Sequence, residues 1–425
     1  MTSDAAMTGG KSAEVRAQYE ALPYPPRDPA DEAKRLVTGS PSHVLEIDHY
    51  VFAGRRDWTA PFRALVAGCG TGDGAIMLGQ QLADLGCPAE IECLDLSDAA
   101  LMIAKARAES RGLRSLRFHR VSLLELDRLG LASFDYIDCC GVLHHLDDPS
   151  AGLGALRRVL KPGGGMGIMV YAPLGRAGVY ETQALLRLAG RDLKLEERLP
   201  LARRLIAALP PTHPFKRNTM LGDHERLGDA GLADLLLHPC DRAYTVSELA
   251  ALVEGAGLAI SALIEPARYR PELLVTEPDL VERLRALEPP DSWAAAELLG
   301  ATLKRHIAYL VEPERRTSAA ARPRSRDAVP VLKDVSVTEL RRTIGTAGAL
   351  VLNFDGAKVR LALPPNAARL IALIDGRRNL GEIEDRAVAD RLVPDRAAFH
   401  AAFATLYDAL NGANILLLRY FRSRK

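Results

Sequence analysis

A run of alternate glycines directly after a short apolar segment constrains this 425-residue chain more than any other feature. The segment FRALVAGCGTGDG, residues 62–74, contains four apolar residues at 64–67, followed by glycines at 68, 70, 72 and 74. Because glycine has no Cβ, such a backbone turns sharply and approaches a ligand closely. The run therefore predicts a strand, a cofactor-binding turn and a helix in succession.

Two phosphate-binding motifs are disfavoured at this turn. A dinucleotide-binding turn needs G-x-G-x-x-G, with the third glycine opening a helix beneath a pyrophosphate. The sixth position here is Asp73, a carboxylate that would repel that group. A P-loop needs Gly-Lys-Ser/Thr, which this turn lacks. A strand-to-helix turn without any ligand is the remaining alternative, so the assignment depends on the segments that follow.

A carboxylate follows the next apolar segment at an informative distance. Residues 89–94, AEIECL, predict a second strand that ends in Asp95, 23 residues after Gly72. A doubly wound domain places an acid at this strand tip, where it accepts hydrogen bonds from ribose hydroxyls. Ser97 is an N-cap candidate for a helix over residues 98–110. A lone acid after a strand is commonly a cap, but with the glycine turn upstream we favour the ribose-binding role.

Three further strands complete the pattern. Residues 117–121 predict a third strand, and residues 134–139, within FDYIDCCGVLHHLDDP, predict a fourth. A helix over 149–160, the turn LKPGGG and a strand over 166–171 follow. Strands that alternate with helices in this way predict a parallel, doubly wound sheet.

This order of segments resembles the S-adenosylmethionine-binding domain of class I methyltransferases. The resemblance rests on the G-x-G-x-G turn, Asp95, the FDxIxxxxVLHHL-like fourth strand and the KPGG turn. It implies an α/β fold with a doubly wound, mostly parallel seven-stranded sheet (Rossmann-like), and S-adenosyl-L-methionine as cofactor. The cofactor-binding residues that it implies between the first and fifth strands are Gly68, Cys69, Gly70, Gly72, Asp73, Asp95, Leu96, Ser122, Leu123, Cys140 and Gly141.

Two positions depart from the family pattern. Val66 stands where the family usually has an acid, two residues before the first glycine, and Ser122 stands where it usually has an Asp that accepts from the adenine amino group. A hydroxyl accepts a hydrogen bond more weakly than a carboxylate does. We expect Asp73, or a segment outside the core, to replace the acid that is missing at position 66.

The N-terminal region combines prolines with two tyrosines. Its first dozen residues are small and polar and predict disorder, whereas four prolines between residues 23 and 29 predict an extended path. The segment YEALPYPP, residues 19–26, resembles the YDxxPYxS segment of rickettsial-type protein lysine methyltransferases. That resemblance implies that residues 1–40 form a strap whose Tyr19 and Tyr24 cover the cofactor, and it points to a protein substrate. A strap that only packs on the core fits the residues equally well.

The general base, if the reaction needs one, is not revealed by any motif. Methyl transfer from a sulfonium is an in-line displacement, so the protein mainly positions the acceptor and excludes water. His145, after the fourth strand, and Tyr171, at the end of the fifth, are the candidate catalytic residues, because either can accept a proton. For each one alone, we favour the alternative that it only shapes the pocket. Four polar residues of the insertion match no metal-site spacing, so we predict no metal and expect them to line an acceptor pocket: Asp223, His224, His238 and Asp241.

The rest of the chain predicts further parts. Residues 41–265 form the methyltransferase domain, with a helical insertion at about 180–245. Residues 266–311 are expected to be a helical extension and residues 312–330 a linker. Residues 331–425 resemble small winged-helix-like α+β domains and contain a hairpin around Asp355-Gly356. Such a module would present a substrate or dimerise, so a homodimer is a hypothesis here.

The composition argues against nucleic-acid and membrane partners. The net charge of +1 gives no field that attracts nucleic acid. The sequence lacks an apolar run of roughly 18 residues and a signal-peptide core, and its six cysteines contain no C-x-x-C pair, which predicts a soluble cytoplasmic protein without a membrane partner. We therefore predict a methyltransferase (EC 2.1.1.-) that acts on an N or O acceptor, with a protein lysine as one candidate. The alternatives are a small-molecule methyltransferase and a non-catalytic S-adenosylmethionine-binding regulator, which Val66 and Ser122 favour.

Overall fold

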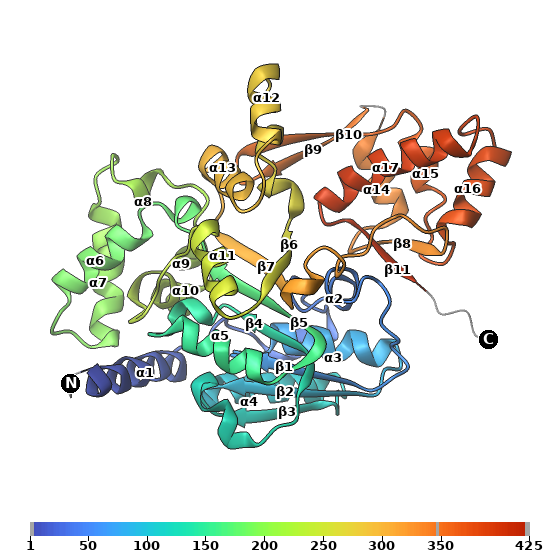
Figure 1. The fold of residues 1–425 in the computed structure, drawn as a ribbon. Helices are drawn as coiled ribbons and strands as arrows, with labels where there is room; N and C mark the ends of the chain where they lie inside the picture. Colours follow the sequence, from blue (N-terminus) through green and yellow to red (C-terminus); the bar gives the residue numbers. More distant parts are fainter. Residues whose placement is uncertain (1–3, 346–347, 421–425) are drawn as a thin grey trace. The chain divides into compact units, whose positions relative to one another are not determined.

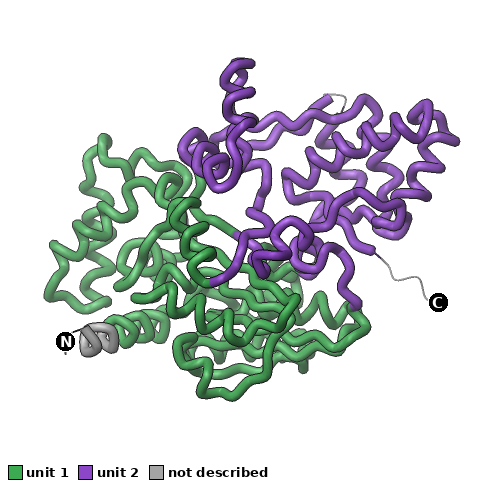
Figure 2. Tube along the Cα trace, viewed as in Figure 1, with its two compact units in different colours: residues 1–43, 58–256, 302–307 green, residues 44–57, 257–301, 308–425 purple. Residues whose placement is uncertain are grey.

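The computed structural model of the chain describes residues 4–345 and 348–420. The chain forms two compact units (Figure 2). Unit 1 contains residues 1–43, 58–256 and 302–307, and unit 2 contains residues 44–57, 257–301 and 308–425.

A seven-stranded sheet has the strand order β3-β2-β1-β4-β5-β7-β6 (Figure 1). β1 runs parallel to both β2 and β4, β2 to β3, and β4 to β5. The strands are β1 (Phe62–Ala67), β2 (Ala89–Asp95), β3 (Leu116–Arg120), β4 (Phe134–Cys140), β5 (Leu160–Tyr171), β6 (Ala259–Ile264) and β7 (Arg305–Val311). The order reverses between β1 and β4, which is where doubly wound sheets bind ligands. The predicted doubly wound, mostly parallel sheet is confirmed.

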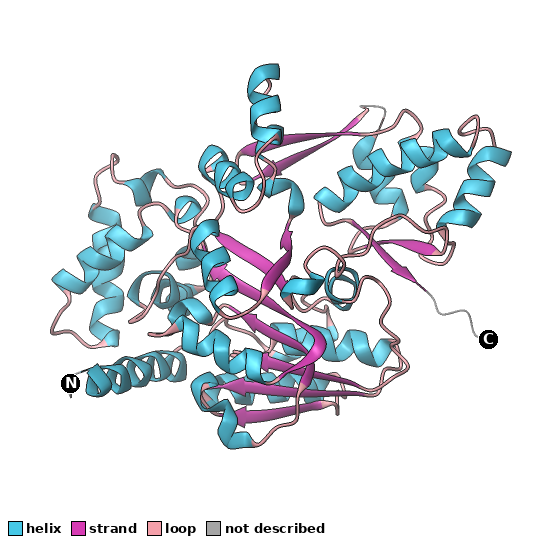
Figure 3. Cartoon of the chain, viewed as in Figure 1, coloured by secondary structure: helices cyan, strands magenta, loops and turns pink. Residues whose placement is uncertain are grey.

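Helices connect β1 to β2, β2 to β3 and β4 to β5 (Figure 3), whereas the 3₁₀ turn η2 (Leu123–Leu129) connects β3 to β4. The helices are α3 (Asp73–Asp84), α4 (Asp98–Ser110) and α5 (Pro149–Arg158). β1 and β4 are buried almost throughout, because a parallel sheet is covered on both faces. The Ser97 hydroxyl accepts from the Ala100 amide at 3.1 Å, so the predicted N-cap of α4 is confirmed.

The insertion after β5 is mainly helical, as predicted. It packs around its own apolar cluster, which includes Val179, Leu186, Phe215 and Leu236. One π-helical turn, η5 (Ala233–Leu237), interrupts the α-helical pattern, and such turns are frequent at functional sites. The helices of the insertion are α6 (Val179–Ala189), α7 (Leu195–Ala208), α8 (Pro214–Arg217), α9 (Asp223–Arg226) and α10 (Gly228–Leu232), and α11 (Val246–Gly255) follows it.

The N-terminal prediction was wrong in one respect. Residues 4–12, expected to be disordered, belong to helix α1 (Asp4–Ala21), and residues 1–3 lie outside the described residues. Val15 and Gln18, about one turn apart, are buried, so tertiary packing stabilises a helix that polar composition alone would not. The extended path therefore begins only after residue 21 and includes one short 3₁₀ turn, η1 (Pro29–Ala33).

Unit 2 contains the remaining elements of the chain. β9 and β10 form an antiparallel hairpin in which Phe354 pairs with Ala357, which confirms the predicted turn at Asp355-Gly356. β8 pairs with β11, also antiparallel. The elements are α2 (Val44–Val51), α12 (Pro278–Arg285), α13 (Asp291–Gly300), β8 (Ala328–Leu332), α14 (Val337–Ile344), β9 (Ala349–Phe354), β10 (Ala357–Ala362), α15 (Ala367–Ile371), α16 (Leu380–Ala389), α17 (Arg396–Gly412) and β11 (Leu416–Tyr420).

Two segments differ from their predicted character. Residues 305–311, expected to be helical, form strand β7, whose residues after Arg305 are all buried. A short buried apolar run fits a helix or a strand equally well, and here pairing within the sheet decides. In the predicted linker, Ala319 and Ala321 are buried, and residues 328–330 already belong to β8 (Ala328–Leu332). The domain boundaries themselves stay predictions.

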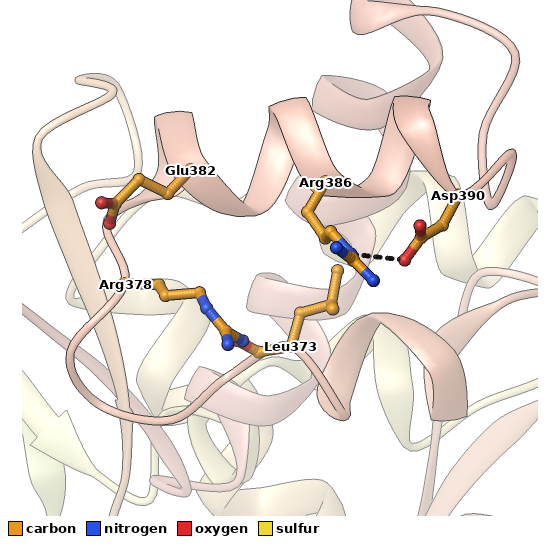
Figure 4. A pocket seen from close by; sticks show the side chains of 5 residues that line it. All are labelled: Leu373, Arg378, Glu382, Arg386 and Asp390. Atoms are coloured by element: carbon orange, nitrogen blue, oxygen red, sulfur yellow. Dashed lines mark hydrogen bonds and ion pairs between the residues drawn. The ribbon is translucent and has the colours of Figure 1, made fainter.

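A polar hollow of about 410 Å³ lies on unit 2 (Figure 4). Charged residues of its lining bind neighbours that are close in sequence. Arg386 Nε lies 2.7 Å from Asp390 Oδ2, and Glu382 accepts from the Asn379 amide at 2.8 Å. Such pairs are typical of a solvated surface. Among the helices of the described residues, none combines the length and apolarity required to cross a lipid bilayer.

Candidate cofactor and acceptor site

The turn after β1 has a backbone that only glycine adopts readily. Gly68, Gly70 and Gly72 have φ values of +74°, +51° and +102°, in the left-handed half of the map. A Cβ on Gly68 would lie 2.2 Å from Val142 Cγ2, and one on Gly70 would lie 2.9 Å from the Tyr24 carbonyl oxygen. The turn therefore combines positive φ with close approach, at the carboxyl end of β1.

Asp95, at the carboxyl end of β2, holds this turn in place. Its Oδ2 accepts from the Gly70 amide at 2.7 Å, and its Oδ1 accepts from the Ser97 amide at 2.9 Å. Burial raises the pKa of Asp95, and these backbone hydrogen bonds oppose the rise. Each carboxylate oxygen has a second lone pair. The structure therefore places Asp95 and its neighbour Leu96 beside the glycine turn, and their contacts with the ribose stay a prediction.

Asp73 ties the N-terminal strap to the glycine turn. Arg27 binds both of its carboxylate oxygens, at 2.8 and 2.6 Å, and Arg107 Nη1 lies 2.8 Å from Oδ1. Burial would raise the pKa of Asp73, but the two guanidinium groups outweigh that effect and lower it. Arg107 is 1% exposed and also pairs with Glu32 of the strap at 2.6 Å, a partner that sequence reasoning missed. These contacts account for Asp73 without a ligand, and its predicted cofactor contact remains untested.

The strap runs along the turn through its backbone as well. Thr71 Oγ1 donates to the Pro25 carbonyl at 2.7 Å, and Ser97 Oγ donates to the Tyr19 carbonyl at 3.1 Å. The Tyr24 carbonyl lies against Gly70. The strap thus brings Tyr19 and Tyr24 to the edge of the sheet where β1 and β2 end.

The other predicted cofactor residues surround the same edge. Ser122 caps a 3₁₀ turn, with its hydroxyl accepting from the Leu124 amide at 3.2 Å, and Leu123 and Cys69 are buried. Cys140 ends β4 with its side chain exposed, and Gly141, with φ of +80°, donates its amide to Met169. Their contacts with the cofactor also stay predictions.

A second cluster, the acceptor cluster, combines Asp234, Tyr171, Arg176, Asp241 and three histidines. Asp234, in η5, is 4% exposed and accepts from the Tyr19 hydroxyl at 3.0 Å and from the Tyr171 hydroxyl at 3.2 Å. Burial raises the pKa of Asp234. Arg176 lies 3.7 Å from the centre of the Tyr171 ring and pairs with Asp241 at 3.2 Å. Sequence reasoning missed Asp234, because a single acid inside a buried helical segment gives no motif.

The rings of the acceptor cluster pack closely, and His145 stacks on His238. The ring centres of His145 and His238 lie 3.8 Å apart, and those of His144 and Tyr171 lie 4.2 Å apart. His145 Nδ1 lies 2.8 Å from the Cys240 carbonyl, which can only accept, so Nδ1 carries the proton and Nε2 has a lone pair. His144 is fully buried, and burial lowers its pKa well below the usual value.

The structure brings together three possible metal ligands, of which only Asp241 was among the four candidates considered from the sequence. One donor atom each from His144, His145 and Asp241 lies within 4.8 Å of the others. Asp241 Oδ2 already accepts from Arg176 at 3.2 Å and from Gln183 at 2.8 Å. A guanidinium on the carboxylate would repel a cation, which makes Asp241 a poor ligand for a metal ion.

Comparisons with known proteins agree with this fold. Residues 65–166 match a family described as "Methyltransferase domain". PKMT2 from Rickettsia typhi, solved in complex with AdoHcy, shares the fold with a TM-score of 0.63 and 12% identity, over 91% of this chain and 76% of that chain. Residues 65–166 therefore form a methyltransferase domain with the class I, Rossmann-like fold, and this family and fold support S-adenosyl-L-methionine as the cofactor.

The chain is also similar to two curated proteins, over stretches of different length. An uncharacterized protein of Synechococcus sp. is 32% identical over 309 residues, which cover 69% of this chain and 70% of that protein. The ubiquinone biosynthesis O-methyltransferase of Marinobacter nauticus is 31% identical over 153 residues, 35% of this chain and 58% of that enzyme. The likeness to the O-methyltransferase therefore spans little more than half of that enzyme.

Proposed function

We propose that the chain transfers the methyl group of S-adenosyl-L-methionine to the side-chain amine of a lysine in a protein substrate. The observation that carries the proposal is Asp234, a buried carboxylate between two tyrosine hydroxyls. A carboxylate flanked by aromatic rings attracts a cationic amine through its charge and through the ring faces. Tyr19 belongs to the strap, whose Tyr24 carbonyl lies against Gly70, so these contacts support an acceptor site on the side of unit 1 where the glycine turn lies.

The chemistry requires an amine without its proton. The cofactor supplies a methyl group bound to a sulfonium, which is the electrophile. The amine lone pair forms the new bond to the methyl carbon, and the electrons of the broken carbon–sulfur bond stay on sulfur. Asp234 orients the amine and accepts its proton, a role favoured by the raised pKa of this carboxyl group. Arg176 is balanced by Asp241, so the charge of Asp234 is left for the substrate.

Two comparisons support a protein lysine as the acceptor. The solved structure that shares the fold over 91% of this chain carries the name PKMT2. The segment YEALPYPP resembles rickettsial-type protein lysine methyltransferases, and Tyr19, one of the two hydroxyl donors to Asp234, is its first residue. The local motif and the buried carboxylate thus indicate the same class of substrate.

The test is incubation of the full chain with methyl-labelled S-adenosylmethionine and a desalted cell lysate, followed by separation of protein, RNA and small molecules. We expect label in protein, at methylated lysine by mass spectrometry. Asp234→Asn should reduce transfer by at least tenfold, whereas Asp229→Asn, in the same insertion but 52% exposed, should not. Labelled small molecules without labelled protein would contradict the proposal.

O-methylation of a small molecule is the second candidate, because His145 has a free acceptor nitrogen. The proton on Nδ1 leaves Nε2 able to accept a hydroxyl proton. The relatives named as ubiquinone biosynthesis O-methyltransferases support this alternative. Label confined to small molecules, and lost in His145→Gln, would favour it. Cofactor binding without transfer to any fraction would favour the regulatory alternative.

A further inference from the structure

Asp138 is a buried carboxylate in an otherwise apolar part of β4. Its side chain is 1% exposed, and its neighbours Ile137 and Cys139 are fully buried. Oδ1 has no hydrogen-bond partner among residues 4–345 and 348–420. Burial raises the pKa of Asp138 to about 7, which a backbone hydrogen bond from Cys140 only partly opposes. Since buried polar atoms are nearly always paired, this oxygen requires an explanation.

The sheet register places Asp138 beside the position where an acid is missing. Val66 of β1 is paired with Asp138 of β4 in the parallel register. Paired residues of parallel strands project from the same face, and adjacent strands lie roughly 4.8 Å apart. The carboxylate is thus one strand away from Val66, which precedes Gly68 by two residues. Asp73, the replacement expected from the sequence, is occupied by Arg27 and Arg107.

Gly74 and Ser42 complete a small polar subsite around this carboxylate. A Cβ on Gly74 would lie 2.9 Å from Asp138 Oδ2 and 2.9 Å from Ser42 Oγ. Ser42 is 2% exposed, and its hydroxyl oxygen also lacks a hydrogen-bond partner within the part of the chain that the structure describes. Any larger residue at position 74 would fill this space. A carboxylate and a hydroxyl, both with unused acceptor capacity, are suited to a group with several N–H donors and a positive charge.

We propose that Asp138, assisted by Ser42, binds the α-ammonium group of the methionine part of S-adenosylmethionine, in place of the acid absent from position 66. The cofactor has two cationic groups, the ammonium and the sulfonium, and only the ammonium has hydrogens to donate. An ammonium on Oδ1 would satisfy the unpaired oxygen and balance its charge. The inference rests on the cofactor of the proposed function and is independent of the acceptor.

The test compares two ligands by titration calorimetry on the full chain. S-adenosylhomocysteine carries the ammonium, whereas 5′-methylthioadenosine has the nucleoside and thioether without the amino-acid part. Asp138→Asn should weaken S-adenosylhomocysteine at least tenfold and leave methylthioadenosine within twofold of its wild-type affinity. Because the second ligand reports an intact nucleoside site, misfolding is distinguished from loss of the subsite.

A double substitution provides the matched control. Asp138→Val should also weaken S-adenosylhomocysteine and leave methylthioadenosine unaffected. Adding Val66→Asp moves the carboxylate to β1 and should restore at least half of the lost affinity for S-adenosylhomocysteine. Unchanged binding of S-adenosylhomocysteine to Asp138→Asn, or equal weakening of both ligands, would overturn the inference. Neither result depends on whether protein is labelled, so failure here is distinct from failure of the lysine proposal.

Discussion

Two buried carboxylates, Glu46 in unit 2 and Asp138 in unit 1, are satisfied to very different degrees. Glu46, in α2 and fully buried, accepts from the Tyr309 hydroxyl at 2.5 Å and from Asn414 Nδ2 at 2.7 Å, and pairs with Lys333 at 2.9 Å. Asp138 has one oxygen without a partner among the described residues. The difference teaches that the buried charge of Glu46 fixes packing within unit 2, whereas the buried carboxylate of Asp138 keeps acceptor capacity next to the glycine turn.

The largest effect should come from removing the satisfied carboxylate. Glu46→Ala removes the buried carboxylate that accepts from Tyr309 and Asn414 and pairs with Lys333. Truncating one partner of a buried ion pair costs about 3–5 kcal/mol of unfolding free energy. Urea denaturation of the variant measures this change. A loss below about 1 kcal/mol would show that the contacts of Glu46 contribute little to stability, and would contradict the proposed difference between the two carboxylates.

The pH dependence of stability should come from the unsatisfied carboxylate. The pKa of Asp138 is about 7 in the folded chain and about 3.9 in the unfolded chain, so the folded state holds more protons between these values. The unfolding free energy should therefore fall as pH rises from 4 to 7, by a few kcal/mol at most, and then level off. Denaturation at a series of pH values should show a smaller slope for Asp138→Asn. An identical slope would contradict the raised pKa.

A substitution in the glycine turn should have a smaller effect than the two carboxylate substitutions. Gly70→Ala forces a residue with a Cβ into a left-handed conformation, which costs about 1–2 kcal/mol, and brings it to 2.9 Å from the Tyr24 carbonyl. We expect the affinity for S-adenosylhomocysteine to fall by about tenfold, because the strap must move. Gly112→Ala is the matched control, since it also has positive φ but has nothing near its Cβ. Equal loss of affinity in both variants would contradict the expectation that displacement of the strap weakens ligand binding.

The smallest effect on stability and binding should come from breaking an ion pair that is exposed to solvent. Asp229 pairs with Arg203 at 2.5 Å, and both side chains are about half exposed. Solvent-exposed pairs of this kind contribute little to stability. Asp229→Asn should leave the melting temperature and the affinity for S-adenosylhomocysteine unchanged within error. A clear loss of either would mean that the insertion transmits its surface charge to the site.

Much of the fold could be predicted because its signals are local. Apolar segments, glycines with positive φ and the Ser97 cap each act within a few residues, so β1 to β5 and their helices follow from the sequence. The errors also have local causes. A polar N terminus suggested disorder at residues 4–12, and an apolar run suggested a helix at residues 305–311.

By itself, the sequence determined the class of fold, the glycine turn and an acid at the tip of β2. Only the tertiary structure decided which side chains meet: Arg27 with Asp73, Tyr19 with Asp234, and Asp138 beside Val66. Tyr19 and Asp234 are 215 positions apart, and no local pattern relates them. The physical reason is that strand order and register, which depend on packing of the whole sheet, set the neighbours of every buried side chain.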